Sequence, residues 1–210
     1  MNDRPPVAGL AHPIRLLDAT FPEAERLPRD LVVDFVEEHG GERPSVRIST
    51  GGLALGDPLQ DMAWEEDGYR YHDALHLTHV VVLGWSPIAR AYLSRQRRSN
   101  PRLQHVEDSG RAKIIEEAVV ALAFEYARGE RFLEDAHAVD SSLLRTIASL
   151  TGGLEVRSRT ASDWERAILR GFEMWRLLRA YGGGSLVLDM HRRLVQFVAP
   201  GEGPAGGGTP

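Results

Sequence analysis

The chain has 210 residues, of which 42% are hydrophobic and 26% are charged, a composition typical of a soluble globular domain. Its formal net charge is −5, and it has no cysteine, which excludes disulfides and thiolate metal sites. The N-terminus lacks the apolar stretch of a signal peptide, and the longest apolar run, residues 80–85, is too short to cross a bilayer. We therefore expect a cytoplasmic protein that does not enter a membrane.

The first third of the chain alternates in the manner of β-strands. Leu31, Val33 and Phe35 share one side of a predicted strand, and Val46 and Ile48 share one side of a second. Glycines between these two segments favour a turn, so an antiparallel pair with one buried face is predicted. Residues 1–12 show no such pattern and are expected to be loosely ordered.

From residue 69 onward the apolar spacing becomes helical. Five helices are predicted, over residues 69–83, 87–98, 108–128, 140–151 and 162–181. Gly84 and Gly129 are expected to end the first and third helices, and Asn100-Pro101 to end the second. A capping box beginning at Ser162 is expected to open the last one.

Alternating apolar residues return near the C-terminus, at residues 186–190 and 195–197, and predict a closing hairpin. The Gly- and Pro-rich tail, residues 201–210, is expected to be disordered. The predicted fold class is α+β and mainly α. A cluster of about five helices would pack with a small antiparallel sheet built from N- and C-terminal segments, in a single globular domain over residues 1–200.

The segment YHDALHLTH, residues 71–79, carries the first candidate site. On a helix His72, His76 and His79 form one stripe, and Asp73 is an i,i+3 neighbour of His76. Two imidazoles one turn apart with a carboxylate alongside can converge on a metal ion, as in the zincin H-E-x-x-H, although aspartate is one methylene shorter than glutamate. The alternative is a set of solvated or hydrogen-bonded histidines, above all for His79.

Two adjacent acids, Glu116 and Glu117, lie in a strongly apolar helical segment. A buried carboxylate costs several kcal/mol unless it is paired or binds a metal. A cation partner is therefore expected, either a metal or a basic side chain such as Arg111 or Lys113. The predicted ligands of a divalent metal (Mg, Mn or Zn) are His72, Asp73, His76, Glu116 and Glu117.

A basic segment lies between residues 86 and 113, where seven basic residues accompany two acids. Arginine's planar fork suits phosphate. The predicted phosphate-binding residues are Arg95, Arg97, Arg98 and Arg102. The alternative is a solvated helix face.

Several motifs together resemble the C-terminal region of MazG-like nucleotide pyrophosphohydrolase proteins, over roughly residues 20–198. They are GDPL (56–59), DGYRYHDALH (67–76), VLGWSP (82–87), RQRRSNP (95–101), EDSGRA (107–112), IEE (115–117) and GFEMW (171–175). The resemblance implies a nucleotide or phosphate context. In that family the region usually follows an all-α pyrophosphohydrolase domain, which this chain is expected to lack.

The resemblance does not supply a ready catalytic set. The all-α pyrophosphohydrolases hold magnesium with E-E-x-x-E and E-x-x-D. Glu116 and Glu117 match the first two positions, but Val120 stands where the third acid would be.

Three hypotheses for function follow. The first is a metal-dependent hydrolase of a nucleotide or related phosphate ester, with Asp73 and Glu117 as catalytic residues. The second is a non-catalytic module that binds nucleotide or RNA or regulates a partner, and the third is a helical di-metal oxidoreductase. The expected partners are a phosphate-bearing small molecule or nucleotide, with RNA, a second copy of the chain or a separate pyrophosphohydrolase as alternatives.

Overall fold

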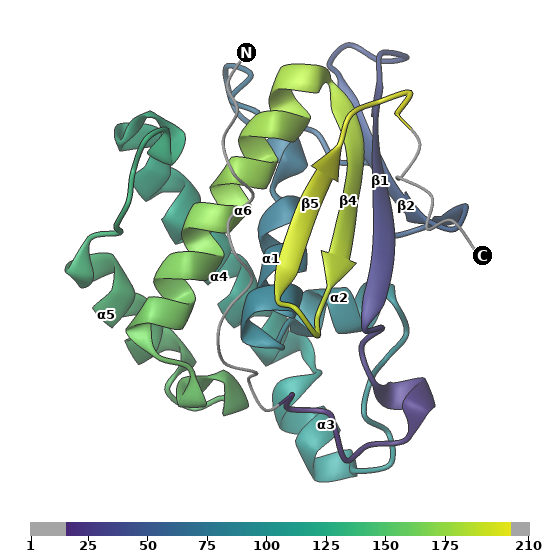
Figure 1. Ribbon diagram of the computed structural model, residues 1–210, viewed down its shortest axis with the longest axis vertical. Coiled ribbons are helices and arrows are strands. Elements are labelled where there is room, and N and C mark those ends of the chain that lie inside the picture. Colours follow the sequence, from purple (N-terminus) through teal and green to yellow (C-terminus); the bar gives the residue numbers. More distant parts are fainter. Residues whose placement is uncertain (1–15, 203–210) are drawn as a thin grey trace.

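A computed structural model describes residues 16–202, in which α-helices pack against one antiparallel β-sheet (Figure 1). The α+β, mainly helical fold class predicted from the sequence is confirmed. The predictions for residues 1–12, and for the tail from residue 203 onward, lie outside the described residues. None of the helices in residues 16–202 combines the length and hydropathy needed to cross a membrane.

The sheet joins the two ends of the described chain. Its strands are β1 (Asp30–Glu38), β2 (Ser45–Thr50), β3 (Leu53–Ala54), β4 (Gly183–Asp189) and β5 (Leu194–Val198), in the order β3-β2-β1-β4-β5. The central strand β1 pairs antiparallel with β2 on one side and with β4 on the other. The predicted sheet of N- and C-terminal segments is therefore confirmed.

One face of the sheet packs on the helices and the other faces outward (Figure 1). Val33 and Phe35 of β1 are buried, as is Leu186, which pairs with Val33 across the β1–β4 ladder. The alternate residues Val32 and Val36 are exposed. This alternation is the one expected of a strand with a single buried face.

Gly183 and Gly184 allow β4 to start directly after a helix. Their φ angles are 125° and 134°, a region that residues with a side chain rarely adopt. A Cβ at Gly183 would lie 2.5 Å from the Phe35 carbonyl oxygen, so the close approach of β4 to β1 requires glycine there.

The helices are α1 (Asp73–Leu83), α2 (Pro87–Tyr92), α3 (Pro101–Glu107), α4 (Gly110–Gly129), α5 (Ser141–Thr151) and α6 (Ala161–Tyr181), with 3₁₀ turns η1 (Glu23–Glu25), η2 (Tyr69–Tyr71), η3 (Arg131–Leu133) and η4 (Glu155–Ser158). Helix α1 is buried along its whole length, between α6, α4 and the sheet. Its polar residues are therefore enclosed by protein on all sides.

Several predicted helix ends differ from the structure. The first helix, predicted from residue 69, begins at Asp73 after the 3₁₀ turn η2. The second helix ends at Tyr92, and Asn100-Pro101 opens α3 instead of closing the helix before it. The Asn100 side chain accepts a hydrogen bond from the Leu103 N–H at 3.1 Å. Proline occupies the first helical position, where a backbone N–H would have no partner within the helix. The capping box of α6 is formed by Thr160 and Asp163, not by Ser162.

Candidate metal site

Helices α1 and α4 bring the predicted histidines and glutamates into one cluster. His76 of α1 and Glu116 of α4 are both almost completely buried, and His76 Nδ1 lies 3.0 Å from Glu116 Oε1. The other nitrogen of the same ring, Nε2, lies 3.6 Å from Glu117 Oε2. The two adjacent glutamates therefore meet opposite nitrogens of His76.

His72 directs a free ring nitrogen at the same place. Its Nδ1 lies 2.8 Å from the Tyr69 carbonyl oxygen, which can only accept a hydrogen bond, so Nδ1 carries the proton. In the neutral ring Nε2 then presents its lone pair, 3.9 Å from Glu117 Oε2. The Tyr69 ring stacks on the His72 ring at 4.3 Å and fixes its orientation.

Asp73 completes the group. One potential ligand atom from each of His72, Asp73 and His76 lies within 4.8 Å of the others. Asp73 is only 1% exposed, and neither of its carboxylate oxygens has a well-aligned hydrogen-bond donor among the described residues, although the Tyr92 hydroxyl lies within reach of them. Burial raises the pKa of Asp73 even though His72 and His76 act to lower it. An ionised carboxylate in this position is costly without a further cation.

Glu116, in contrast, is surrounded by donors. His79 Nδ1 lies 3.1 Å from its Oε1, and the Ser86 hydroxyl and the Ile88 N–H donate to its Oε2, each at 3.0 Å. Burial alone would raise the pKa of Glu116, but the charge and hydrogen bonds of His76 and His79 lower it to about 2. Burial alone would lower the pKa of His76, but the Glu116 charge raises it to about 10.

His79 belongs to the packing of the core. Burial lowers its pKa, its Nδ1 faces Glu116, and its ring meets the edge of Trp164 at 5.4 Å. This arrangement agrees with the alternative reading of His79 as a hydrogen-bonded histidine.

Glu117 and two tyrosines border the cluster on the solvent side. The Glu117 side chain is 42% exposed, whereas the groups behind it are buried. Burial raises the pKa of Tyr92, and so do the charges of Asp73 and Glu117, which places its hydroxyl close to these carboxylates. Nothing in the spacing of Tyr92 pointed to this role, because Tyr92 is the last residue of α2 and the turn between α1 and α2 places it beside the cluster.

The basic segment does not form one exposed arginine surface. Arg97 is fully buried, and its guanidinium pairs with Asp108 and Glu155, each at 2.7 Å. Arg95 donates to the carbonyl oxygens of residues 23 and 24. The predicted phosphate contact of Arg97 is thus replaced by internal pairing.

Arg98 and Arg102 are exposed, so of the four predicted phosphate-binding arginines these two present guanidinium groups to solvent. The expected pairing of the two glutamates with Arg111 or Lys113 is replaced by pairing with histidines.

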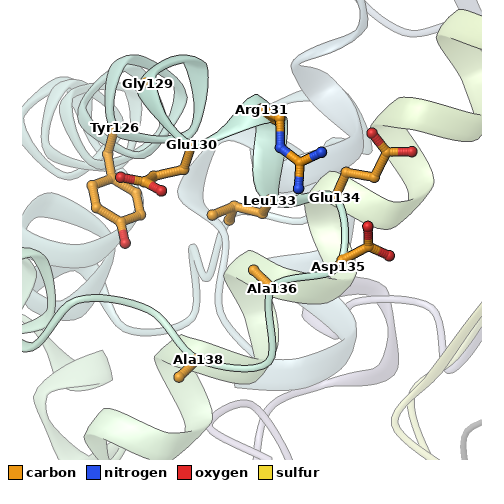
Figure 2. A pocket seen from close by; sticks show the side chains of 9 residues that line it. All are labelled: Tyr126, Gly129, Glu130, Arg131, Leu133, Glu134, Asp135, Ala136 and Ala138. Carbon is orange, nitrogen blue, oxygen red and sulfur yellow. The ribbon is translucent and has the colours of Figure 1, made fainter.

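A separate pocket of about 400 Å³ lies where α4 leads into α5 (Figure 2). It is lined by Tyr126, Gly129, Glu130, Arg131, Leu133, Glu134, Asp135, Ala136 and Ala138. None of the predicted site residues belongs to it.

The comparisons with known proteins gave one result. The family described as the MazG C-terminal domain matches residues 12–201, almost the whole chain. Searches of curated proteins and of solved structures found no match. The resemblance carried by the seven sequence motifs is thereby confirmed, and the chain belongs to the MazG C-terminal domain family.

Proposed function

We propose that the protein is a metal-dependent hydrolase of a nucleotide or a related phosphate ester. The metal would be held by His72, Asp73, His76 and Glu117. The observation that carries the proposal is the buried Asp73 carboxylate, which has no well-aligned hydrogen-bond donor among the described residues and lies beside the ring nitrogens of two histidines. A divalent cation there would offset a cost that the chain's own described side chains leave uncompensated.

The donor set fits a divalent transition metal. Two imidazole nitrogens and two carboxylates suit zinc, manganese or iron better than magnesium, which prefers oxygen ligands. When bound, such an ion supplies Lewis acidity that activates water and offsets charge on a phosphate. The Tyr69 carbonyl holds His72 in the tautomer that leaves Nε2 free, in the way that hydrogen-bond partners of histidine ligands fix the tautomer in metal sites.

The side chains of the cluster divide into two roles. Asp73 is enclosed and suited to holding a cation. Glu117 is half-exposed at the solvent side, where it can accept a proton from water. Arg98 and Arg102 remain the proposed phosphate contacts, because their guanidinium groups are exposed. The nucleotide or phosphate substrate class rests on the MazG-like context of the family.

The first test is metal content by elemental analysis. Wild type is compared with the His72→Ala/His76→Ala double variant and with a control, His105→Ala/His191→Ala, in which both replaced residues are exposed. We expect near-stoichiometric metal in wild type and control and none in the site variant. Equal metal in all three proteins would reject the site.

The second test is hydrolysis of nucleoside triphosphates and simple phosphate esters with the metal identified. We expect activity in wild type and its loss in Glu117→Gln. Absence of metal, together with salt-dependent pyrophosphate binding that survives a chelator, would favour the non-catalytic binding module. Tightly bound iron without hydrolysis would favour the oxidoreductase.

A further inference from the structure

Glu116 occupies a socket built from two helices and the turn between them. The turn is Gly84-Trp85-Ser86-Pro87, part of the VLGWSP motif, and it connects α1 to α2. Ser86 is the N-cap of α2 and is fully buried, and its hydroxyl oxygen accepts a hydrogen bond from the Ala89 N–H at 2.9 Å. The same hydroxyl donates to Glu116 Oε2, so a single serine both caps the helix and holds the carboxylate.

The socket determines which way the carboxylate faces. The Ile88 N–H and the Ser86 hydroxyl both donate to Oε2, which leaves Oε1 for the imidazoles of His76 and His79. Three hydrogen-bond donors and the His76 ring, whose Nδ1 lies 3.0 Å away, surround the carboxylate and leave it little capacity for a metal ion. His76 Nδ1 lies within pairing distance of Oε1 but is not aligned as a hydrogen bond. Such contacts often tighten only when a site is occupied.

We propose that Glu116 is a positioning residue, not a metal ligand, and that the Ser86–Ile88 socket holds it so that the protons of His76 and His79 stay on Nδ1. The proposal rests on the proposed metal site, because it leaves His76 Nε2 free for the metal. It revises the sequence prediction that Glu116 coordinates metal. It also gives a role to the W-S-P turn.

The chemistry of the socket makes a sharp variant available. In Glu116→Gln the amide oxygen must face the Ile88 N–H, because a backbone N–H can only donate. The amide NH₂ then faces the two imidazoles, and each Nδ1 becomes an acceptor. The ring protons move to Nε2, so His76 can no longer offer that nitrogen to a metal.

The experiment is ¹⁵N-histidine NMR with metal titration. It is carried out on wild type, Glu116→Gln and Glu125→Gln, which has an exposed glutamate on the same helix as a control. In wild type we expect Nδ1-protonated His79 without metal, and with Zn²⁺ added a His76 bound through Nε2. In Glu116→Gln we expect both protons on Nε2 and an affinity for Zn²⁺ reduced about 10- to 100-fold, as when the hydrogen-bond partner of a metal ligand is replaced.

Two results would overturn the proposal. One is a Glu116→Gln protein that keeps the Nδ1 protons and wild-type affinity. The other is a wild-type His76 bound to Zn²⁺ through Nδ1, which would make Glu116 and His79 its co-ligands. If wild type binds no Zn²⁺, the metal-dependent function fails, but the His79 proton in the metal-free variant still decides whether Glu116 positions the ring. Ser86→Ala, which keeps the Ile88 N–H, should retain the wild-type protonation.

Discussion

Two of the groups of buried charges in residues 16–202 are compensated in opposite ways. In the first, Arg97 meets Asp108 and Glu155, and Arg90 meets Asp18, so each guanidinium has a carboxylate partner. In the second, the two adjacent glutamates of α4 pair with imidazoles, and among residues 16–202 they pair with no arginine or lysine and Asp73 has no well-aligned hydrogen-bond donor. The arginine–carboxylate pairs compensate each other's charge, whereas the carboxylate beside the histidines is left with a charge that a bound cation could compensate.

The arginine group stabilises the fold, whereas the histidine and carboxylate group is the candidate binding site. The basic composition of residues 86–113 had suggested that the arginines bind the ligand. The arginines were expected to meet a ligand, yet the most buried of them bind parts of the fold. A charged group that is satisfied within the protein contributes to stability when its partner is present. A buried charged group without a partner lowers stability, and its presence indicates that it binds a ligand or ion.

The largest expected effect comes from breaking the arginine network. Arg97→Met should lower the free energy of unfolding by about 3–5 kcal/mol, because it leaves Asp108 and Glu155 without their main partner. Arg98→Met next to it is exposed and should change stability by less than about 0.5 kcal/mol. Denaturant unfolding of metal-free protein measures both. Similar effects from the two variants would contradict the division between buried and exposed arginines.

The opposite sign is expected at the second group. Asp73→Asn should stabilise metal-free protein by about 1–3 kcal/mol, because it removes a buried charge whose environment raises its pKa. The same variant should lose metal. Urea unfolding of metal-free wild type and variant tests the sign. A destabilised Asp73→Asn protein would mean that the histidines alone compensate the carboxylate.

Glu107 gives a pH-dependent effect at the edge of the arginine network. Burial raises the pKa of Glu107 to about 7, and the nearby Glu155 and Asp108 charges also raise it. A raised acid pKa favours the folded state below about pH 4.5, and this stability is lost as the pH rises through 7. Between pH 5 and pH 8 the free energy of unfolding should therefore fall by about 2 kcal/mol less in Glu107→Gln than in wild type. Parallel stability curves for the two proteins would exclude this role.

The smallest effect is expected at the exposed arginines. Removing Arg98 or Arg102 should weaken binding of inorganic pyrophosphate by less than about tenfold each, because exposed charges are screened by salt. The weakening should shrink further at high ionic strength. Calorimetric titrations at two salt concentrations measure it. Binding that is indifferent to both variants would leave the basic segment without a phosphate role.

Local patterns predicted much of the fold. The alternation around Val33 and Phe35 placed the strand and its buried face correctly, and the spacing of His72 and His76 brought them to one site, with His72 at the N-cap of α1 and His76 within it. The start of α3 was also readable, because Asn followed by Pro is an N-cap and first-turn pair. The same Asn-Pro pair also predicts the end of a preceding helix, because proline disfavours helical backbone at the residue before it.

The ion-pair partners of the buried charged residues could not be predicted from the sequence. Arg97 pairs with Glu155, a residue on a distant 3₁₀ turn, and no local pattern links them. The different roles of Glu116 and Glu117 could not be predicted from the pattern I-E-E either. It arises because α2 begins against one of the two neighbours and leaves the other facing solvent.

The pairing of β1 with β4 has a consequence for how the chain folds. Asp30 lies opposite Asp189, so the centre of the sheet joins segments from the two ends of the described chain. Such distant contacts must overcome a large loop-closure entropy, and they slow folding. During synthesis β1 and β2 emerge long before β4 and wait with an unpaired edge, the kind of surface that promotes aggregation. The helices, whose backbone hydrogen bonds are local, can form in that interval, and closure of the sheet is the late step that completes the core.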